Sequence, residues 1–589
     1  MRTPRPLPAL ALVLALAGCD STTPGEKLHD LFAREWQNRL EEDPLQATSV
    51  GVHTWGDRLP SVTPADLERR AGQTEAFLAE LDGIDLEALG PEDRINAAIF
   101  RGQLENRMRD YRLGDHQIPF NADSGFQTGF ARLPFNVPLE NVQDYENYLA
   151  RLRDWPRYVG EQIVLMRQGL ERGMTQPRLI LDGIEGTMSA HIVEVPEESV
   201  FWTPLKELPV GVPESEHERL REEAREAILG GVVRGYRTLL GFFEGEYVSG
   251  ARETLGAHDL PDGEAYYRHK IKEFTSLDLT PQEIHDIGLR EVGRIRTEMD
   301  GVIQQVGFEG TFAEFLEFLR TDPRFYPETA EELLKQAAWI AKTMDGKLPA
   351  LFKTLPRLPY TVEAVPADLA PKYTAGRAVG APVGSTQPGR YWVNTYALDT
   401  RPLYNLEALT LHEAVPGHHL QIALNQELEG LPEFRQYSYI SAFGEGWGLY
   451  SEWLGLEAGF YTDPYSNFGR LTYEMWRACR LVVDTGVHAF GWTREQMRDF
   501  MAENTALSLH EIATETDRYI SWPAQALAYK LGEIKIRDLR RRAEAALGTA
   551  FDVREFHDAV LGNGSVPLDV LEQVITEWIE EQKTATGNA

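Results

Sequence analysis

The sequence predicts a mainly α-helical protein with one small β element. Apolar residues recur at spacings of three and four over long segments, and a single aromatic-rich segment has strand character instead. Hydrophobic residues make up 42% of the 589-residue chain and aromatic residues 10%, which excludes wholesale disorder. The length suffices for two to four domain-sized units, or for one large helical body with two lobes.

Long segments with the helical period cover most of the first half of the chain. They are residues 28–40, 64–81, 91–112, 142–173, 214–250 and 281–306. Thr63 before Pro64, and Thr280 before Pro281, each place an N-cap residue directly before a proline that suits the first helical position. Segments rich in Pro and Gly, such as 204–213 and 355–366, separate these helical blocks.

The expected β element is the segment 381–396, which is rich in Gly, Pro and then aromatic residues. Within it, residues 390–396 suit a strand. The segment directly precedes the helix that carries the candidate metal ligands. Two interpretations remain open: a strand that binds an extended peptide through main-chain hydrogen bonds, or a small structural hairpin.

The N-terminus has the features of a secretory signal. Two arginines in the first five residues form a basic head, and residues 9–17 are an apolar run too short to span a bilayer. Leu16-Ala17-Gly18-Cys19 follows and resembles the bacterial lipobox. The resemblance implies a signal peptide over residues 1–18 and a Cys19 that carries lipid chains such as palmitate.

A lipidated cysteine implies a membrane-anchored protein of the cell envelope that faces the periplasm. Residues 19–27 are then the lipidated cysteine and a polar tether, and Asp20 resembles an inner-membrane retention signal. The alternative is an ordinary signal peptide that happens to end beside a cysteine. Elsewhere the sequence lacks the roughly 20 consecutive apolar residues of a spanning helix, so the lipid is the expected contact with the membrane.

Charge and cysteine content exclude other classes of protein. Lys and Arg number 59 and Asp and Glu 91, which gives a formal charge of −32 that repels nucleic acid. Cys479 is the only cysteine besides Cys19, so the fold cannot depend on disulfides. Cys479 lies in a helical pattern and is expected to be a buried structural thiol. Gly-rich phosphate loops and Gly-x-Ser-x-Gly nucleophile motifs do not occur.

The segment Leu411-His412-Glu413-Ala414-Val415-Pro416-Gly417-His418-His419 carries the chemistry. In zinc peptidases, a helix presents His next to Glu and a second His about one turn later. The imidazoles hold the metal, and the Glu takes a proton from the attacking water. This pattern predicts one Zn²⁺, with His412 as a ligand and Glu413 as the general base.

The spacing of the second histidine requires a break in the helix. On a regular helix, His418 lies about 600° around and about 9 Å along from His412, and His419 lies about 10.5 Å along. Neither shares one ion with His412, because zinc–nitrogen bonds are about 2.0–2.1 Å. Pro416 and Gly417 stand where the break is needed. His418 is therefore the predicted second ligand, while His419 packs nearby or touches substrate.

Two carboxylates supply the rest of the predicted site. Glu445 and Glu452 are seven residues apart, which places both on one helical face. Glu445 follows His418 by 27 residues, a separation that fits two antiparallel helices and their loop. We expect Glu445 to be the third ligand and Glu452 to orient a ligating histidine.

These motifs resemble the bacterial family DUF885, which is grouped with the zincin-like metallopeptidases. The resemblance covers most of the mature chain. It is carried by Gly389-x-x-x-x-Asn394-Thr395, His412-Glu413-x-x-Pro416-Gly417-His418, Glu445-Gly446-Trp447-x-x-Tyr450, Asp484-Thr485-Gly486-Val487-His488, and Arg518-Tyr519-Ile520-x-Trp522-Pro523-x-Gln525-Ala526-x-x-Tyr529-Lys530. The order of strand, ligand helix, third-ligand helix and late Tyr is more distantly similar to peptidases of the angiotensin-converting-enzyme and oligopeptidase type.

The resemblance implies a zincin-like body of two helical lobes that face a deep cleft admitting short peptides. The lobes are assigned to residues 28–370 and to a metallopeptidase-like region at 371–589. By this analogy Tyr529, Tyr519 and His488 are candidates to stabilise the oxyanion. The assigned substrate-binding residues are Asn394, Arg518 and Lys530.

The function expected from the sequence is zinc-dependent hydrolysis of short peptides outside the cytoplasm. Glu413 acts as general base and then as proton donor to the leaving amine. Two alternatives remain: a peptide-binding lipoprotein without catalysis, and a metal-dependent hydrolase of a non-peptide amide or ester. The sequence does not define the oligomeric state.

Overall fold

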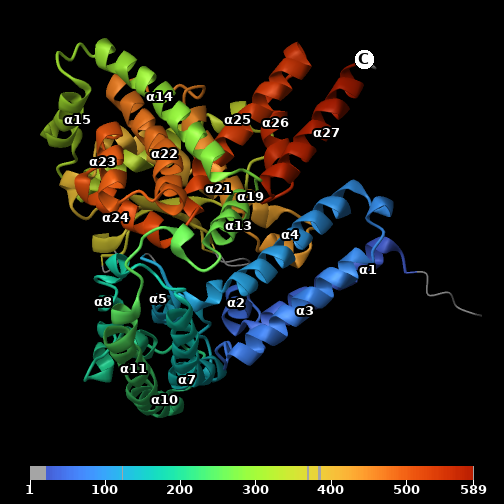
Figure 1. The fold of residues 1–589 in the computed structure, drawn as a ribbon, viewed down its shortest axis with the longest axis vertical. Coiled ribbons are helices and arrows are strands. Elements are labelled where there is room, and N and C mark those ends of the chain that lie inside the picture. The colour runs from blue at the N-terminus through green and yellow to red at the C-terminus, as the bar shows by residue number, and fades with distance from the viewer. Residues whose placement is uncertain (1–21, 123, 368–369, 382–386, 588–589) are drawn as a thin grey trace, which may run out of the picture.

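The computed structural model describes residues 22–122, 124–367, 370–381 and 387–587 (Figure 1). Helices account for 70% of the chain and strands for 3%, which confirms the mainly α-helical prediction. The expected signal peptide, the lipidated Cys19 and Asp20 lie outside the described residues. Among the described helices, none combines the length and apolar character needed to cross a membrane.

The first long helices begin and end close to the predicted residues. They are α1 (Pro24–Glu42), α3 (Pro64–Asp82), α4 (Pro91–Leu113) and α7 (Val142–Arg172). The side chains of Thr23, Thr63 and Thr280 each accept a hydrogen bond from a backbone amide of the first helical turn. Because Thr23 caps α1, the predicted tether to residue 27 is too long, and residues 24–27 are helical.

The segment 214–250 forms one helical run that changes pitch twice. It comprises α10 (Glu214–Ala227), α11 (Arg234–Phe242) and α12 (Val248–Gly250), joined by the π-helical turns η6 (Ile228–Val233) and η7 (Phe243–Tyr247). Glycines let this run approach α7, since a Cβ on Gly231 would lie 2.1 Å from the carbonyl oxygen of Leu152. This close packing places α10 and α11 against α7, as Figure 1 shows.

The apolar core is divided differently from the predicted lobes. One cluster of buried residues lies between residues 59 and 251 and surrounds Trp155, which stacks on Phe130 at 3.9 Å between ring centroids. A second, larger cluster joins α1 and α4 to the C-terminal helices, where the rings of Phe32 and Phe100 lie 4.8 and 5.2 Å from Phe434. Apolar contacts therefore cross the expected boundary between residues 370 and 371. The two facing lobes and their deep cleft stay a prediction.

A three-stranded sheet precedes the candidate ligands. It contains β1 (Tyr360–Ala364), β2 (Gly376–Val379) and β3 (Gly389–Val393) in the order β1-β3-β2. The central strand β3 is parallel to β1 and antiparallel to β2. The predicted strand is thus present, but the β element begins at Tyr360 rather than Ala381. Strand β1 lies in a Pro-containing segment with too few residues to establish an alternating pattern.

The C-terminal helices surround one central helix, α22 (Pro464–Phe490), which is buried along most of its length. Helix α14 (Pro281–Gln305) packs along it (Figure 1). Cys479 is fully buried on α22 and free, as predicted. Helices α21 (Ser441–Leu454) and α25 (Ala528–Leu547) pack closely because Gly446 and Gly532 meet between them.

Seven more helices lie after the sheet. They are α18 (Leu406–Glu413), α19 (His418–Glu427), α20 (Glu433–Gln436), α23 (Arg494–Asn504), α24 (Leu509–Ser521), α26 (Val553–Leu561) and α27 (Leu568–Gly587). Helix α13 (Gly263–Thr275) lies in the segment before the sheet.

Candidate metal centre

The helix breaks between the two candidate histidines, as the sequence predicts. His412 lies in the last turn of α18, and His418 is the first residue of α19. Between them the Val415-Pro416 peptide bond is cis, and Trp447 donates a hydrogen bond of 2.8 Å from Nε1 to the Pro416 carbonyl oxygen. Gly417 is required here, because a Cβ would lie 1.9 Å from the carbonyl oxygen of His412.

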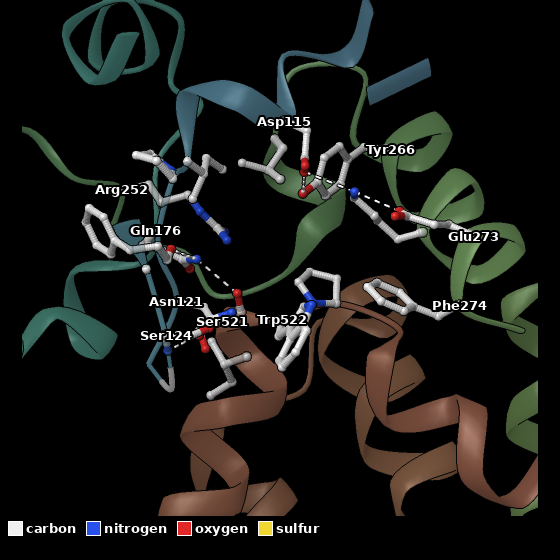
Figure 2. A pocket seen from close by; sticks show the side chains of 18 residues that line it. Asp115, Asn121, Ser124, Gln176, Arg252, Tyr266, Glu273, Phe274, Ser521 and Trp522 are labelled. Carbon is white, nitrogen blue, oxygen red and sulfur yellow. Dashed lines mark hydrogen bonds and ion pairs between the residues drawn. The ribbon is translucent and has the colours of Figure 1, made fainter. Parts of the chain in front are cut away.

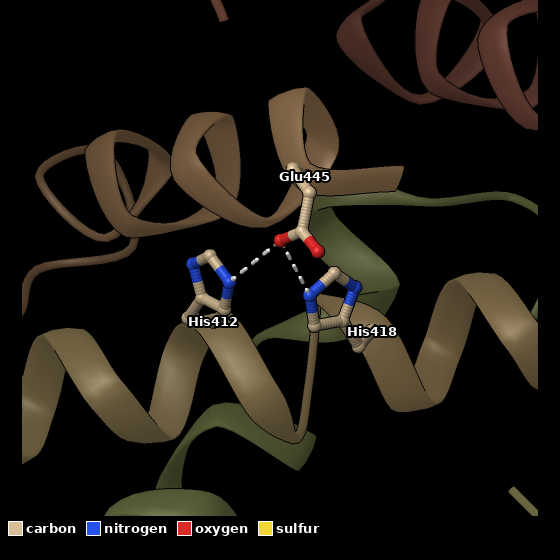
Figure 3. A group of neighbouring side chains, drawn as sticks. All are labelled: His412, His418 and Glu445. Carbon is tan, nitrogen blue, oxygen red and sulfur yellow. Dashed lines mark ion pairs between the residues drawn. The ribbon is translucent and has the colours of Figure 1, made fainter. Parts of the chain in front are cut away.

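This break brings both imidazoles to Glu445, which projects from α21 (Figure 3). Nε2 of His412 lies 3.7 Å and Nε2 of His418 lies 3.3 Å from Oε2 of Glu445. The three candidate ligand atoms all lie within 4.8 Å of one another. Ligand atoms at about 2.0–2.1 Å from a tetrahedral zinc ion are roughly 3.3 Å apart. The three predicted ligands therefore fit one zinc ion with only small side-chain movements.

A buried carboxylate holds the imidazole of His412. Its Nδ1 lies 2.7 Å from Oε1 of Glu452, whose side chain is 1% exposed and contacts Nη2 of Arg477 at 3.3 Å. This is the orienting position predicted for Glu452, and it leaves Nε2 directed at Glu445. Gly448 makes room for the ring, since a Cβ there would lie 2.6 Å from Cε1 of His412.

The electrostatics of the three residues favour a bound cation. Burial opposes a charged His412, but hydrogen bonds to Glu445 and Glu452 outweigh it and raise its pKa to about 9. Burial also opposes an ionised Glu445, yet its hydrogen bonds and the charges of His412 and His418 hold its pKa well below the usual range. The cluster thus stabilises positive charge between the two histidines and the carboxylate, which is also what a divalent metal supplies.

Glu413, the predicted general base, faces the edge of the sheet. Its Oε2 accepts a hydrogen bond of 2.7 Å from the backbone amide of Ala378 in β2. The negative charge of Glu413 contributes to the raised pKa of His412, so the Glu413 carboxylate lies beside the candidate ligands. The predicted base therefore lies between the histidines and an edge strand.

Two tyrosines lie near Glu445, and the sequence indicated only one of them. Burial, and then the charge of Glu445, raise the pKa of Tyr529, which places this predicted residue beside the site. The hydroxyl of Tyr439 donates a hydrogen bond of 3.2 Å to Oε1 of Glu445, and 53% of the residue is exposed. Tyr439 was not predicted because it lies in an irregular segment before α21, where no periodic pattern marks it. Arg477 was not predicted as a site residue either, because the sequence around it has the pattern of a buried core helix.

Two other histidines have structural roles. Nδ1 of His488 accepts a hydrogen bond from the backbone amide of Ala257, and its Nε2 lies 2.9 Å from the Tyr519 carbonyl oxygen. Burial lowers the pKa of His488 to about 3, so the ring is neutral and both nitrogens are occupied. The proposed oxyanion role of His488 is therefore wrong. The ring of His419 lies 4.6 Å from that of Tyr360 at the start of β1, and its Nε2 lies 3.2 Å from the carbonyl oxygen of Leu358 just before the strand; it packs there rather than supporting a ligand.

Tyr519 and Arg518 bind protein groups in the structure. The hydroxyl of Tyr519 donates to Glu515 at 2.5 Å and accepts from Nε of Arg480 at 2.7 Å, in a fully buried position. It therefore has no free hydrogen for an oxyanion, which corrects that prediction. Arg518 donates to Glu515 at 3.0 Å and to Gln525 at 2.7 Å, but 14% of its side chain stays exposed.

The last two predicted substrate-binding residues are fully buried. Nζ of Lys530 lies 2.9 Å from carboxylate oxygens of both Glu474 and Glu533. The side-chain amide of Asn394 donates to backbone carbonyl oxygens of residues 370, 373 and 374, and its Oδ1 accepts from the amide of Tyr396. Both assignments are corrected: Lys530 neutralises a buried ion cluster, and Asn394 fixes the segment that leads into β2.

A second group of metal-type ligands already contains a cation. Asp110, His269 and Glu273 lie close enough together to share an ion. However, the ammonium group of Lys270 lies 2.8 Å from carboxylate oxygens of both Asp110 and Glu273. Since this ammonium takes the place of a metal, we do not assign a metal site there.

A cavity of about 290 Å³ lies apart from the candidate ligands. Figure 2 shows Arg252 and Gln176 on one side of it and Glu273 and Phe274 on the other, with Trp522 below. The lining residues come from three segments, 115–125, 252–274 and 520–523, together with Gln176. His412, His418 and Glu445 are not among them.

The fold and this site define a mainly helical protein with a cluster of two histidines and one glutamate at a helix break. The chain belongs to DUF885, described as bacterial proteins of unknown function, whose profile matches residues 44–575. It is similar to a candidate lipoprotein from Colwellia psychrerythraea, with 29% identity and a TM-score of 0.89 over 95% of this chain and 100% of that one.

A candidate lipoprotein of unknown function from Shewanella oneidensis has the same fold. The two chains are 18% identical, with a TM-score of 0.71 over 94% of this chain and 100% of the other. Among curated proteins, none matches this chain.

Proposed function

We propose that this protein is a zinc-dependent peptidase that hydrolyses short peptides outside the cytoplasm. One observation carries the proposal: a helix break directs His412 and His418 at Glu445, while a buried carboxylate holds the far side of the His412 ring. Two imidazoles and one carboxylate leave a fourth position open, which is typical of catalytic rather than structural zinc sites.

Each nearby side chain has a role in this reaction. Bound zinc supplies a Lewis acid that polarises the scissile carbonyl and lowers the pKa of water. Glu413 takes a proton from the attacking water and delivers it to the leaving amine. Tyr529, which lies near Glu445, would donate a hydrogen bond to the oxyanion, Tyr439 holds Oε1 of Glu445, and Glu452 keeps the His412 proton on Nδ1.

The sheet supports peptides as the substrate class. Strand β2 is an edge strand, and its Ala378 amide points away from β3 toward the carboxylate of Glu413. Peptides add to such edges in extended form through main-chain hydrogen bonds. A peptide bound along β2 therefore passes directly beside the proposed general base.

The cellular location follows from the N-terminal motif. The Leu16-Ala17-Gly18-Cys19 sequence resembles a lipobox, and both structural relatives are described as candidate lipoproteins. We place the enzyme on the periplasmic side of the envelope, anchored through Cys19, and Asp20 favours the inner membrane.

Metal analysis and a Glu413→Gln variant test the proposal together. Protein purified without chelators should contain about one zinc per chain, and it should cleave components of a peptide mixture read by mass spectrometry. Glu413→Gln should keep the fold and the metal but lose hydrolysis by at least about 100-fold, the contribution expected of a general base. Glu429→Gln, an exposed residue beyond α19, is the matched control.

Three results count against this function. Unchanged hydrolysis by the Glu413→Gln variant would show that Glu413 is not the general base. A chain that takes up no transition metal but binds peptides would be a peptide-binding lipoprotein. Turnover of amides or esters in a substrate library, with peptides left intact, would identify the hydrolase of non-peptide substrates.

A further inference from the structure

Three guanidinium groups gather near Tyr529. Arg477 and Arg480 project from α22 and Arg518 from α24. We call these three residues the arginine cluster. The guanidinium of Arg480 lies between two aromatic rings, 4.4 Å from the centroid of Trp476 and 4.3 Å from that of Tyr529, and the residue is 3% exposed.

The arginine cluster contains donors that lack acceptors. Arg480 donates from Nε to the hydroxyl of Tyr519 at 2.7 Å and from Nη2 to Glu515 at 3.1 Å. Its Nη1 is buried and has no hydrogen-bond partner among the residues that the structure describes, and the same holds for Nε of Arg477. Leaving a buried cationic donor unbonded is costly, so such atoms indicate a missing acceptor.

The nearby carboxylates do not balance these charges. Glu515 is shared between Arg480 and Arg518. The carboxylate of Glu452, which contacts Arg477, also holds His412. The cluster therefore retains positive charge in a buried, aromatic environment, where charge interactions are strong.

Glu511 offsets only part of this charge at neutral pH. Burial, and then the charge of Glu515, raise its pKa to about 7, although Arg401, Arg477 and Arg480 act in the opposite direction. About half of the Glu511 side chains are therefore protonated near pH 7.

The arginine cluster adjoins the candidate metal centre through two connections. Tyr529 covers Arg480 with its ring, and its pKa responds to the charge of Glu445. Arg477 contacts Glu452, which in turn holds His412. A ligand group at the cluster would therefore lie beside a peptide bond at the metal centre, and Arg518, whose side chain is 14% exposed, is the most exposed of the three arginines.

We propose that the arginine cluster is a subsite for a carboxylate of the substrate. This rests on the proposed function and narrows it to short peptides that carry a free carboxylate close to the scissile bond. The carboxylate comes either from the C-terminus or from an acidic side chain. It accepts hydrogen bonds from Nη1 of Arg480 and from Arg518, supplying the acceptor that the folded chain lacks.

Matched peptides test the subsite in the full-length, zinc-loaded protein. The probes are tri- and tetra-alanine as free acids, the same peptides as C-terminal amides, and amides with one alanine replaced by aspartate. We expect kcat/KM for the free acids to exceed that for the plain amides by at least about tenfold, as for a charge-assisted hydrogen bond. Restored cleavage of the aspartate-containing amides would assign the carboxylate to a side chain, and no restoration would assign it to the C-terminus.

Arg480→Met keeps an apolar stem between Trp476 and Tyr529 while removing the charge. It should reduce the acid-to-amide ratio to less than about threefold, and Arg480→Lys should keep an intermediate ratio. Arg541→Met, at an exposed position of α25, is the control and should keep the wild-type ratio.

Binding of the same peptides, measured by calorimetry, separates the two proposals. Equal rates and equal affinities for acids and amides overturn the carboxylate subsite and leave the peptidase intact. A preference for acids in binding without any hydrolysis supports the subsite and overturns the peptidase. Should Arg480→Met not fold, Arg480→Lys together with the comparison of acids and amides in the wild-type protein decides.

Discussion

Tyr439 connects the candidate ligand Glu445 to the surface of the protein. Its hydroxyl donates to Oε1, while the candidate ligand atom of the same carboxylate is Oε2. A donor on the second oxygen fixes the carboxylate orientation and leaves one oxygen for a metal. The approach of the Tyr439 ring depends on Gly444, where a Cβ would lie 2.3 Å from the hydroxyl.

Tyr439→Phe should therefore weaken zinc binding without affecting the fold. Groups that support a metal ligand typically contribute about 10- to 100-fold in affinity, and the exposed ring contributes little to the core. The measurement is competition for zinc with a chromophoric chelator. Tyr437→Phe is the control, because that ring stacks on Trp36 away from the ligands. Equal zinc affinities of the Tyr439→Phe variant and the wild type would show that Tyr439 does not support Glu445 as a metal ligand.

The candidate ligands could be predicted where spacing restricts the geometry. The choice of His412, His418 and Glu445, with Glu452 to orient a histidine, follows from helical periodicity and from the length of a zinc–nitrogen bond. The oxyanion and substrate-binding candidates rested on the family resemblance. Several of these residues are buried and hydrogen-bonded to other protein groups, which excludes the predicted roles. His488 and Lys530 are polar residues in a helical region of the sequence, and nothing local reveals that their partners are the backbone of Ala257 and the buried Glu474.

Among the elements, the break between α18 and α19 determines whether the site forms. A Cβ on Gly417 would meet backbone atoms of residues 411 and 412, which cannot move without displacing the ligand helix. By contrast, α1, α3, α4, α7 and α14 follow directly from their sequence period, and α3 and α14 also follow from their N-cap residues. Strand β1 and the π turns between α10 and α12 do not, because strand pairing and packing against α7 define them.

Gly417→Ala should disrupt both stability and metal binding. The new methyl group overlaps the His412 carbonyl, so the cost should exceed the about 1–3 kcal/mol of ordinary overpacking. Urea unfolding and zinc affinity measure the two effects. Gly301→Ala on α14 is the control: its Cβ meets nothing within 4 Å, and it should be neutral or stabilising by up to about 1 kcal/mol. Wild-type zinc affinity in Gly417→Ala would show that the break needs no glycine.

For the whole molecule, α22 connects the site to distant parts of the core. Its N-terminal half carries the ion cluster around Glu474, its middle carries the arginines, and its end carries Asp484. Asp484 is fully buried and accepts hydrogen bonds from the hydroxyl of Tyr267 on α13 at 2.6 Å and from the amide of Ala524 at 3.2 Å. Three segments that are distant in sequence thus meet at one carboxyl group.

This carboxyl group should make stability depend on pH. Burial raises the pKa of Asp484 to about 7, although its hydrogen bonds oppose the shift, whereas the unfolded value is about 3.9. Between these values the folded chain keeps a proton that the unfolded chain has released. The free energy of unfolding contributed by Asp484 therefore falls as pH rises from about 4 to about 7, and it is constant above that range.

Asp484→Asn removes this titration and keeps an acceptor for Tyr267. The urea midpoint, measured with chelator present at pH 5 and pH 8, should fall less between the two pH values in the variant than in the wild type. Asp300→Asn, at an exposed position of α14, should retain the wild-type difference. If Asp484→Asn also retains it, the group that makes stability pH-dependent lies elsewhere, and Asp484 would be ionised in the folded protein across this range.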